Sequence, residues 1–244
     1  EQAAPSLALP EPLSGDAAEK RLDAAVAAGS WVAAALESPD AKRGQQTALF
    51  DEAPKVLWAA TADDLLRFEG GAATSALARL AREGRLVAGD AKALLHEVCP
   101  MDSAEEALVA PEEMDAARLF DCGVAGYLLD SDNGHFSVGE LYQNPKVLGG
   151  TLPEPTDDAP AAAIEAAALA LMPRLSELLE KDGSDGLFRK VEMPLLLVLL
   201  QMERTGLHAD PERLREQSEG LGAEIDRMVA EIHEAAGEDF NIDS

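Results

Sequence analysis

Short apolar runs dominate the first part of the chain, whereas apolar residues at helical spacing dominate the later part. The runs are typical of short strands and lie at 31–36, 47–50, 55–60 and 86–88. Apolar positions three and four residues apart predict helices at 16–28, 74–83, 90–99, 119–129, 161–181, 188–205 and 211–236. Strands that cluster early and helices that dominate late predict an α/β domain followed by a helical extension.

A further helix is expected after the third apolar run. Thr61 is followed by two acidic residues, a combination that favours a helix start, and Gly70 would end that helix. Its apolar face would consist of Leu65, Leu66 and Phe68. The sequence therefore predicts a short amphipathic helix between the third and fourth apolar runs.

Two short segments are set apart by their polar or proline-rich composition, and one acidic residue lies near the start of a predicted helix. Residues 1–14 contain three prolines and no periodicity, which is typical of an extended linker. Asp51, Glu52 and Pro54 predict a hairpin connection between the apolar runs on either side. Asp121 lies near the start of the predicted helix at 119–129, and we expect its carboxylate to cap that helix.

The composition excludes several classes of protein. The chain has 244 residues, of which 46 are acidic and 20 are basic, giving a net charge of −26. Such a charge argues against binding of nucleic acid or of an anionic membrane surface by this piece alone. The longest apolar run, 193–202, is about half of what a bilayer span needs. Two cysteines, Cys99 and Cys122, are best interpreted as reduced thiols, so we expect a cytoplasmic protein.

The stretch from Val191 to Ser244 resembles the junction between the proofreading-type domain and the polymerase domain of bacterial family A DNA polymerases, DNA polymerase I. The positions that match this family are Glu192, Pro194, Leu195, Val198, Leu199, Met202, Glu203, Gly206, Asp210, Phe240, Asn241 and Ser244. A second match resembles the late part of the family's 3′–5′ exonuclease domain, at Phe120–Asp121, Val124–Ala125, Tyr127–Leu129, Ser137 and Glu140–Leu141.

The resemblance implies a ribonuclease-H-like fold, in which helices flank a mixed sheet. It also implies a linker at 1–14, an exonuclease-like domain at 15–187, and the first helices of the polymerase thumb at 188–244. The chain begins with Glu1 rather than Met, and we expect it to be a piece of a longer protein. That parent would be a DNA-directed DNA polymerase that acts in DNA replication and repair, binds DNA and uses Mg²⁺.

Four acidic positions carry the nuclease chemistry of the family, because two metal ions must be held by several carboxylates. The first motif would place an Asp at Ala35 and a Glu at Glu37. The acidic residue of the second motif is replaced by Leu95. In the third motif, Ala163 stands for a Tyr and Ala167 for an Asp. Only Glu37 could remain, so we predict a vestigial domain with no catalytic, metal-binding or cofactor-binding residues.

Two alternatives remain open. Asp90, Glu37 and Glu165 could form a relocated metal site and make the chain an active exonuclease. The chain could instead be an acidic helical interaction module. The helix at 211–236 carries one apolar stripe and therefore needs a partner, which packing back on the domain or self-association of the chain could supply. The residues of the stripe are Leu214, Leu221, Ile225, Met228, Val229 and Ile232.

Overall fold

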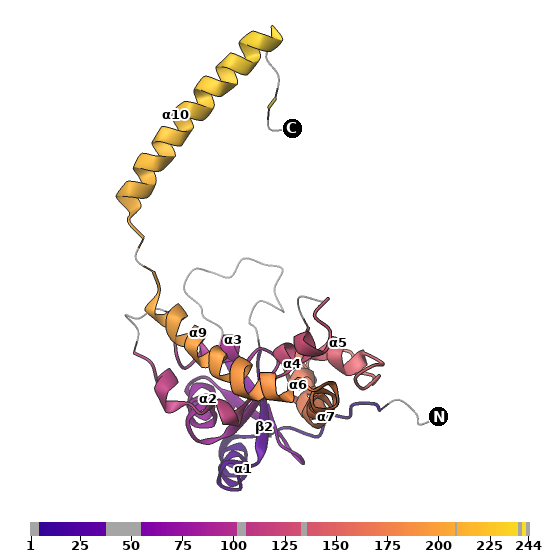
Figure 1. Cartoon of the computed structure of the whole chain (residues 1–244). Coiled ribbons are helices and arrows are strands. Elements are labelled where there is room, and N and C mark those ends of the chain that lie inside the picture. The colour runs from indigo at the N-terminus through magenta and orange to yellow at the C-terminus, as the bar shows by residue number, and fades with distance from the viewer. Residues whose placement is uncertain are drawn as a thin grey trace. The chain divides into compact units, whose positions relative to one another are not determined.

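A computed structural model describes residues 5–37, 55–101, 106–132, 136–207, 209–238 and 241–242. The chain forms two compact units, Glu1–Gly206 and Leu207–Ser244. Figure 1 shows the first unit as a sheet surrounded by helices and the second as a single long helix. The expected strand at 47–50 and the hairpin connection at 51–54 lie outside the described residues.

A six-stranded mixed sheet forms the centre of the first unit, in the order β1-β4-β3-β2-β5-β6. Strand β3 runs antiparallel to β2 and β4, whereas the other neighbouring pairs are parallel. The predicted α/β architecture with a mixed sheet is therefore confirmed. The strands are β1 (Leu13–Ser14), β2 (Trp31–Glu37), β3 (Val56–Ala60), β4 (Leu65–Glu69), β5 (Arg85–Ala88) and β6 (Leu119–Asp121).

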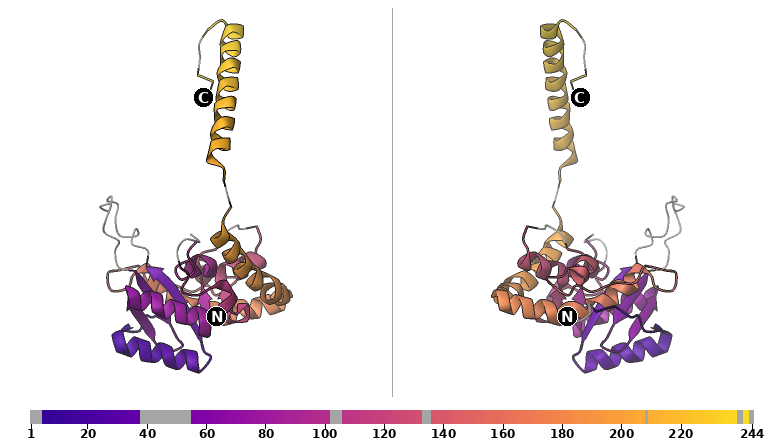
Figure 2. Two further views of the ribbon diagram at one scale, coloured as in Figure 1. Left: turned by 90° about the vertical axis from the view of Figure 1, so that its left-hand side faces the viewer. Right: turned by 90° about the vertical axis from the view of Figure 1, so that its right-hand side faces the viewer.

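Helices cover both faces of this sheet (Figures 1 and 2). On one face, α1 and α2 pack with Leu66 and Phe68 of β4, and on the other, α6 packs on β2 and β3. The helices of the first unit are α1 (Gly15–Ala27), α2 (Gly71–Glu83), α3 (Ala91–Leu95), α4 (Cys122–Leu129), α5 (Val138–Gln143), α6 (Ala161–Ala168), α7 (Met172–Asp182), α8 (Asp185–Leu187) and α9 (Met193–Thr205). Single 3₁₀ turns lie at Pro111–Glu113, Ala116–Arg118 and Leu169–Leu171, and a π-helical turn at Phe188–Glu192.

The helix expected after Thr61 is wrong, because this segment is strand β4. Thr61 closes a tight turn in which its Oγ1 accepts a hydrogen bond from the Asp64 N–H at 3.0 Å. The chain then returns along β3, with Ala60 opposite Leu65. Leu65 faces α6, whereas Leu66 and Phe68 face α1 and α2. A strand buried on both faces lacks the alternation that marks a half-buried strand, and sheet pairing decides its conformation.

The predicted helix at 119–129 is correct only from Cys122 onward. Leu119 and Phe120 belong to β6, which pairs in parallel with β5 through Leu86 and Val87. Both residues are buried, and a short buried strand cannot be told from a helix by periodicity alone. The expected cap is confirmed, since the Asp121 Oδ1 accepts a hydrogen bond from the Val124 N–H at 2.8 Å.

The N-terminal segment is extended from residue 5, as expected of residues 1–14, but it is also attached to the first unit. Leu7 donates a backbone hydrogen bond of 3.0 Å to the Thr151 carbonyl, and Leu13 and Ser14 form β1 beside β4. Leu7 and Leu9 pack against buried clusters of the domain. This segment therefore forms part of the folded unit.

The helical extension shares the core of the sheet as far as α9. Phe188, Met193, Leu196 and Leu200 are buried in the same cluster as β5 and β6. The Phe188 ring lies 4.8 Å from the Phe120 ring, measured between centroids. The compact unit consequently extends through Gly206, whereas the boundary between 187 and 188 that the resemblance implies stays a prediction.

The second unit consists mainly of α10 (Pro211–Ala236), which matches the predicted helix at 211–236. The Asp210 Oδ1 caps it by accepting hydrogen bonds of 3.1 Å from the Glu212 and Arg213 N–H groups. Gly237 ends the helix with a φ of 76°, a left-handed conformation that glycine adopts without strain. None of the described helices in either unit is long and apolar enough to cross a bilayer.

Candidate functional site

Helix α6 lies directly on β2, at the place where the resemblance puts metal-binding carboxylates. Ala35 and Ala163 are 7% and 1% exposed and belong to one small apolar cluster. The buried members of this cluster are Ala35, Val56, Trp58, Leu65, Ala162, Ala163 and Ala166. The structure therefore places the Asp position of the first motif and the Tyr position of the third motif in one apolar cluster.

The other predicted positions do not join this cluster. Leu95 is fully buried in the main core. Ala167 lines a separate cavity of about 580 Å³, together with Trp31 and Ala33. Glu37 ends β2, and its Oε2 accepts a hydrogen bond from the Trp58 Nε1 at 3.2 Å. The possible remnant is thus engaged by an indole on the neighbouring strand.

A different group of carboxylates surrounds a cavity of about 380 Å³. Asp90 follows β5 and Asp121 ends β6, so the carboxyl ends of two parallel strands place them at one edge of the sheet. Glu165 of α6 and Glu192 complete the acidic lining. Of the residues proposed for a relocated site, Asp90 and Glu165 therefore line one cavity, whereas Glu37 is not among the residues that line it.

Asp121 is the charged residue at the centre of this region and is only 3% exposed. Its Oδ2 accepts a hydrogen bond from the Ala91 N–H at 2.7 Å, and its Oδ1 caps α4, so one carboxylate joins the starts of α3 and α4. Burial raises the pKa of Asp121 to about 6, against the opposing effect of these hydrogen bonds. The neighbouring charge of Asp90 adds to the rise.

Two glycines allow the elements around this cavity to approach each other. A Cβ atom on Gly89 would lie 2.8 Å from the Glu165 Oε1 and 2.9 Å from the Val138 Cγ2. Gly123 donates its N–H to the Gly89 carbonyl at 2.9 Å. Glu165 is consequently pressed against backbone, and burial raises the pKa of its carboxyl.

This arrangement is poorly suited to divalent metal ions. Asp90 accepts the Ala93 N–H at 2.9 Å and caps α3, while Asp121 caps α4 and binds the Ala91 N–H. Within the described residues, no group of three or more His, Cys, Asp or Glu side chains could hold a metal ion. The Asp90 and Asp121 carboxylates here organise the starts of α3 and α4.

The sequence prediction placed Asp90 and Glu165 in one relocated site but missed Asp121 as their neighbour. The signal was available in part, because Asp90 and Asp121 each follow a short apolar run. Residues that follow neighbouring parallel strands meet at one edge of a sheet. Treating 119–121 as the start of a helix concealed that relation.

Comparisons with known proteins point to one group. No family model matches the chain. DNA polymerase I of Bacillus subtilis is 32% identical over 139 residues, which is 51% of this chain and 16% of the relative. DNA polymerase I of Chloroflexus aurantiacus is 41% identical over 88 residues, or 35% of this chain and 9% of the relative. The chain thus spans less than one fifth of the length of these curated relatives.

A solved structure shows the same fold. It is the POL domain of Pol1 from M. smegmatis, in complex with a DNA primer-template and dNTP. The TM-score is 0.58, with 20% sequence identity, and the match covers 78% of this chain and 32% of that chain. The α/β architecture with its helical C-terminal part is therefore shared with a polymerase structure.

Proposed function

We propose that this chain, which is related to the bacterial family A DNA polymerases, is a non-catalytic part of such an enzyme. In this proposal, the sheet and its helices form a ribonuclease-H-like 3′–5′ exonuclease domain that no longer cleaves DNA. Residues 188–244 begin the polymerase thumb. The parent would be a cytoplasmic DNA-directed DNA polymerase that binds DNA and uses Mg²⁺ in replication and repair.

The small apolar cluster between β2 and α6, which includes Ala35, is the observation that carries the proposal. Phosphodiester hydrolysis by two metal ions needs several carboxylates around ions about 4 Å apart. Ala35, where the resemblance places an Asp, instead lies in a buried apolar cluster with Ala163, where it places a Tyr. A hydrated divalent ion requires polar oxygen ligands, which methyl groups cannot supply.

A structural role follows from the continuity of the core. The residues that open the polymerase-like part, Phe188 and Met193, are buried together with β5 and β6. Burial of a Phe side chain stabilises a fold by about 1.5–3 kcal/mol relative to leaving it exposed. The exonuclease-like sheet would therefore hold the first polymerase helix, α9, in a fixed position.

The test combines metal binding with nuclease activity. The 244-residue chain is titrated with Mn²⁺ in a calorimeter and incubated with an end-labelled single strand, beside a proofreading-competent family A polymerase as positive control. We expect neither Mn²⁺ binding nor 3′–5′ shortening. Stoichiometric Mn²⁺ binding with a digestion ladder that Glu37→Ala or Asp90→Ala abolishes would refute the proposal.

The second candidate is an active exonuclease with relocated carboxylates. The observation in its favour is that Asp90 and Glu165 line one cavity together with Asp121. The hydrogen bonds that occupy Asp90 and Asp121 argue against it. Glu165→Gln offers a second variant, because a working site would lose activity whereas a vestigial domain would show none before or after the change.

The third candidate, an acidic interaction module, rests on α10. Five large apolar residues of this helix are between 43% and 61% exposed, namely Leu214, Leu221, Ile225, Met228 and Ile232. Self-association of the 211–236 helix would cover them. Sedimentation velocity of the chain and of Ile225→Glu tests this, since a dimer that the charge disrupts supports the module and a monomer contradicts it.

A further inference from the structure

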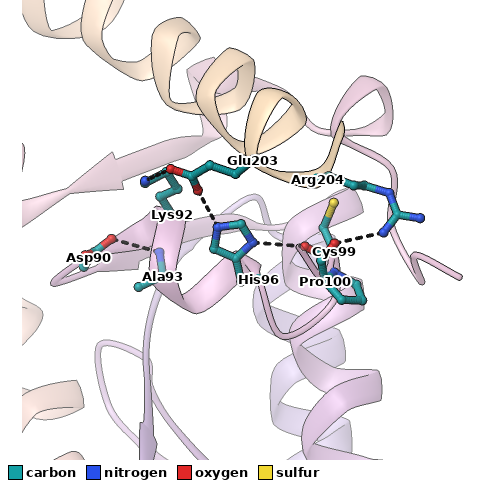
Figure 3. Close-up of polar contacts among 8 residues, drawn as sticks. All are labelled: Asp90, Lys92, Ala93, His96, Cys99, Pro100, Glu203 and Arg204. Carbon is teal, nitrogen blue, oxygen red and sulfur yellow. Dashed lines mark hydrogen bonds and ion pairs between the residues drawn. The ribbon is translucent and has the colours of Figure 1, made fainter. Parts of the chain in front are cut away.

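The last turn of α9 is fastened to the region of α3 by a network of polar contacts (Figure 3). Glu203 forms an ion pair with Lys92 through one oxygen, and its Oε2 lies 2.6 Å from the Nε2 of His96. The Nδ1 of His96 lies 3.2 Å from the Cys99 carbonyl oxygen. Arg204 donates a hydrogen bond of 2.9 Å to the Pro100 carbonyl. One short stretch of chain after β5 thus holds two neighbouring side chains of α9.

The chemistry of His96 is decided by what its two ring nitrogens face. A carbonyl oxygen and a carboxylate oxygen are both acceptors, so each contact needs an N–H from the ring. Neutral imidazole carries one N–H, whereas imidazolium carries two. Both contacts can be hydrogen bonds only when His96 is protonated.

The other charged groups around His96 define its electrostatic setting. Glu203 is the carboxylate that faces it, and the hydrogen bonds from Lys92 and His96 lower the pKa of Glu203. Lys92 of α3 and Arg204 of α9 are the neighbouring cations, and Glu97 is paired with Lys55 at 2.6 Å. Glu203 therefore contacts both Lys92 and His96, one through each side of its carboxylate.

Polar contacts matter here because apolar burial ends one turn earlier. Leu200 is fully buried, but Met202 is 61% exposed, and Glu203 and Arg204 are half-buried. Two residues after Arg204, the first compact unit ends at Gly206. The contacts of Glu203 and Arg204 thus fix the final turn of the unit.

We propose that His96 is a proton-dependent latch, which holds the last turn of α9 on α3 when it is protonated and releases that turn when it is neutral. When the ring loses a proton, one of its nitrogens has no N–H to donate. That nitrogen and the Cys99 or Glu203 oxygen opposite it then present only lone pairs to each other, and the hydrogen bond is lost. The Lys92 and Arg204 contacts remain, so α9 loosens at its end without leaving the core. This inference is independent of the polymerase and nuclease assignments.

Hydrogen exchange of the whole chain, read by mass spectrometry between pH 5.5 and pH 8.5 and corrected for intrinsic exchange, tests the latch. Hydrogen bonds to charged groups contribute about tenfold or more to a local equilibrium. We expect protection in a peptide spanning 200–206 to fall by about tenfold over this range, relative to a control peptide in α2. His96→Gln, which cannot titrate, should abolish the pH dependence, and His233→Gln in α10 should leave it intact.

A second variant tests the contact between His96 and Glu203. Glu203→Gln should also remove the pH dependence of protection, because an amide can donate to a neutral ring nitrogen or accept from a protonated one. This comparison remains valid if His96→Gln folds poorly, since Glu203→Gln conserves the shape of the side chain. Protection that does not change with pH, or a pH dependence that persists in Glu203→Gln, would overturn the proposal.

Discussion

Asp121→Asn tests whether burial controls the ionisation of the carboxylate that lies where β5 and β6 end. Asp121 is 3% exposed, and burial raises its pKa from 3.8 to about 6. The folded chain therefore binds this proton more tightly than the unfolded chain does. The stabilisation from proton uptake is fully present below the unfolded pKa and is lost as the pH rises through the folded pKa of about 6.

The size of the effect follows from the two pKa values. One pKa unit corresponds to about 1.4 kcal/mol, so the full difference between the two states is about 3 kcal/mol. Between pH 7.5 and pH 4.5, about 2 kcal/mol of this difference should be observed. The free energy of unfolding of the native chain should rise by this amount relative to Asp121→Asn, which has no titrating group at this position.

Urea unfolding of both chains at pH 7.5, 6.0 and 4.5, followed by circular dichroism, measures this difference. Glu113→Gln provides a control of opposite sign, because hydrogen bonds from the Ala110 N–H and from Arg82 lower the pKa of Glu113. The stabilisation from Glu113 is present above its unfolded pKa and is lost as the pH falls. A difference between the native chain and Asp121→Asn that stays constant with pH would show that burial of this carboxylate does not control its ionisation.

The remaining predictions concern packing and capping. Phe188→Ala should lower the free energy of unfolding of the first unit by about 3–5 kcal/mol in urea melts, because its fully buried ring packs against Phe120. Gly89→Ala should destabilise by about 1–3 kcal/mol, and adding Glu165→Ala should recover part of this loss in a double-mutant cycle, because the new methyl group meets the Glu165 carboxylate. Asp210→Ala should cost α10 about 1 kcal/mol of helix stability, seen as reduced helical ellipticity, because two N–H groups lose their acceptor.

Much of the fold could be predicted from the sequence, because most elements have clear local signals. The helix at 211–236 was predicted with its observed bounds, because its apolar positions recur at helical spacing. Strands β2, β3 and β5 were found as apolar runs bounded by polar or glycine residues. These signals lie within a few residues of each other, so no knowledge of tertiary contacts was needed.

The failures share a physical cause. Strand β4 is buried on both faces, and its hydrogen bonds to β3 decide its conformation. Strand β6 pairs in parallel with β5, and those hydrogen bonds decide its conformation. An apolar segment such as Leu65–Phe68 has no local feature that distinguishes the two conformations. The place of Asp121 in the acidic cavity was missed for the same reason, because Asp121 could be placed beside Asp90 only once β6 was known to pair with β5.

The packing around Ala35 and Ala163 bears on whether a metal ion could be held between β2 and α6. In a polar cleft at Ala35, a nearby Asp or Glu could reach a metal ion. Ala35 and Ala163 are instead buried in one apolar cluster, together with Trp58 and Leu65. An ionised carboxylate placed there would be desolvated without a partner, which is costly unless a metal ion compensates it. The carboxylates that the chain does place nearby, Asp90 and Asp121, are engaged by helix N–H groups. The contact between β2 and α6 is therefore a packed apolar interface, and its stability depends on the side chains that fill it.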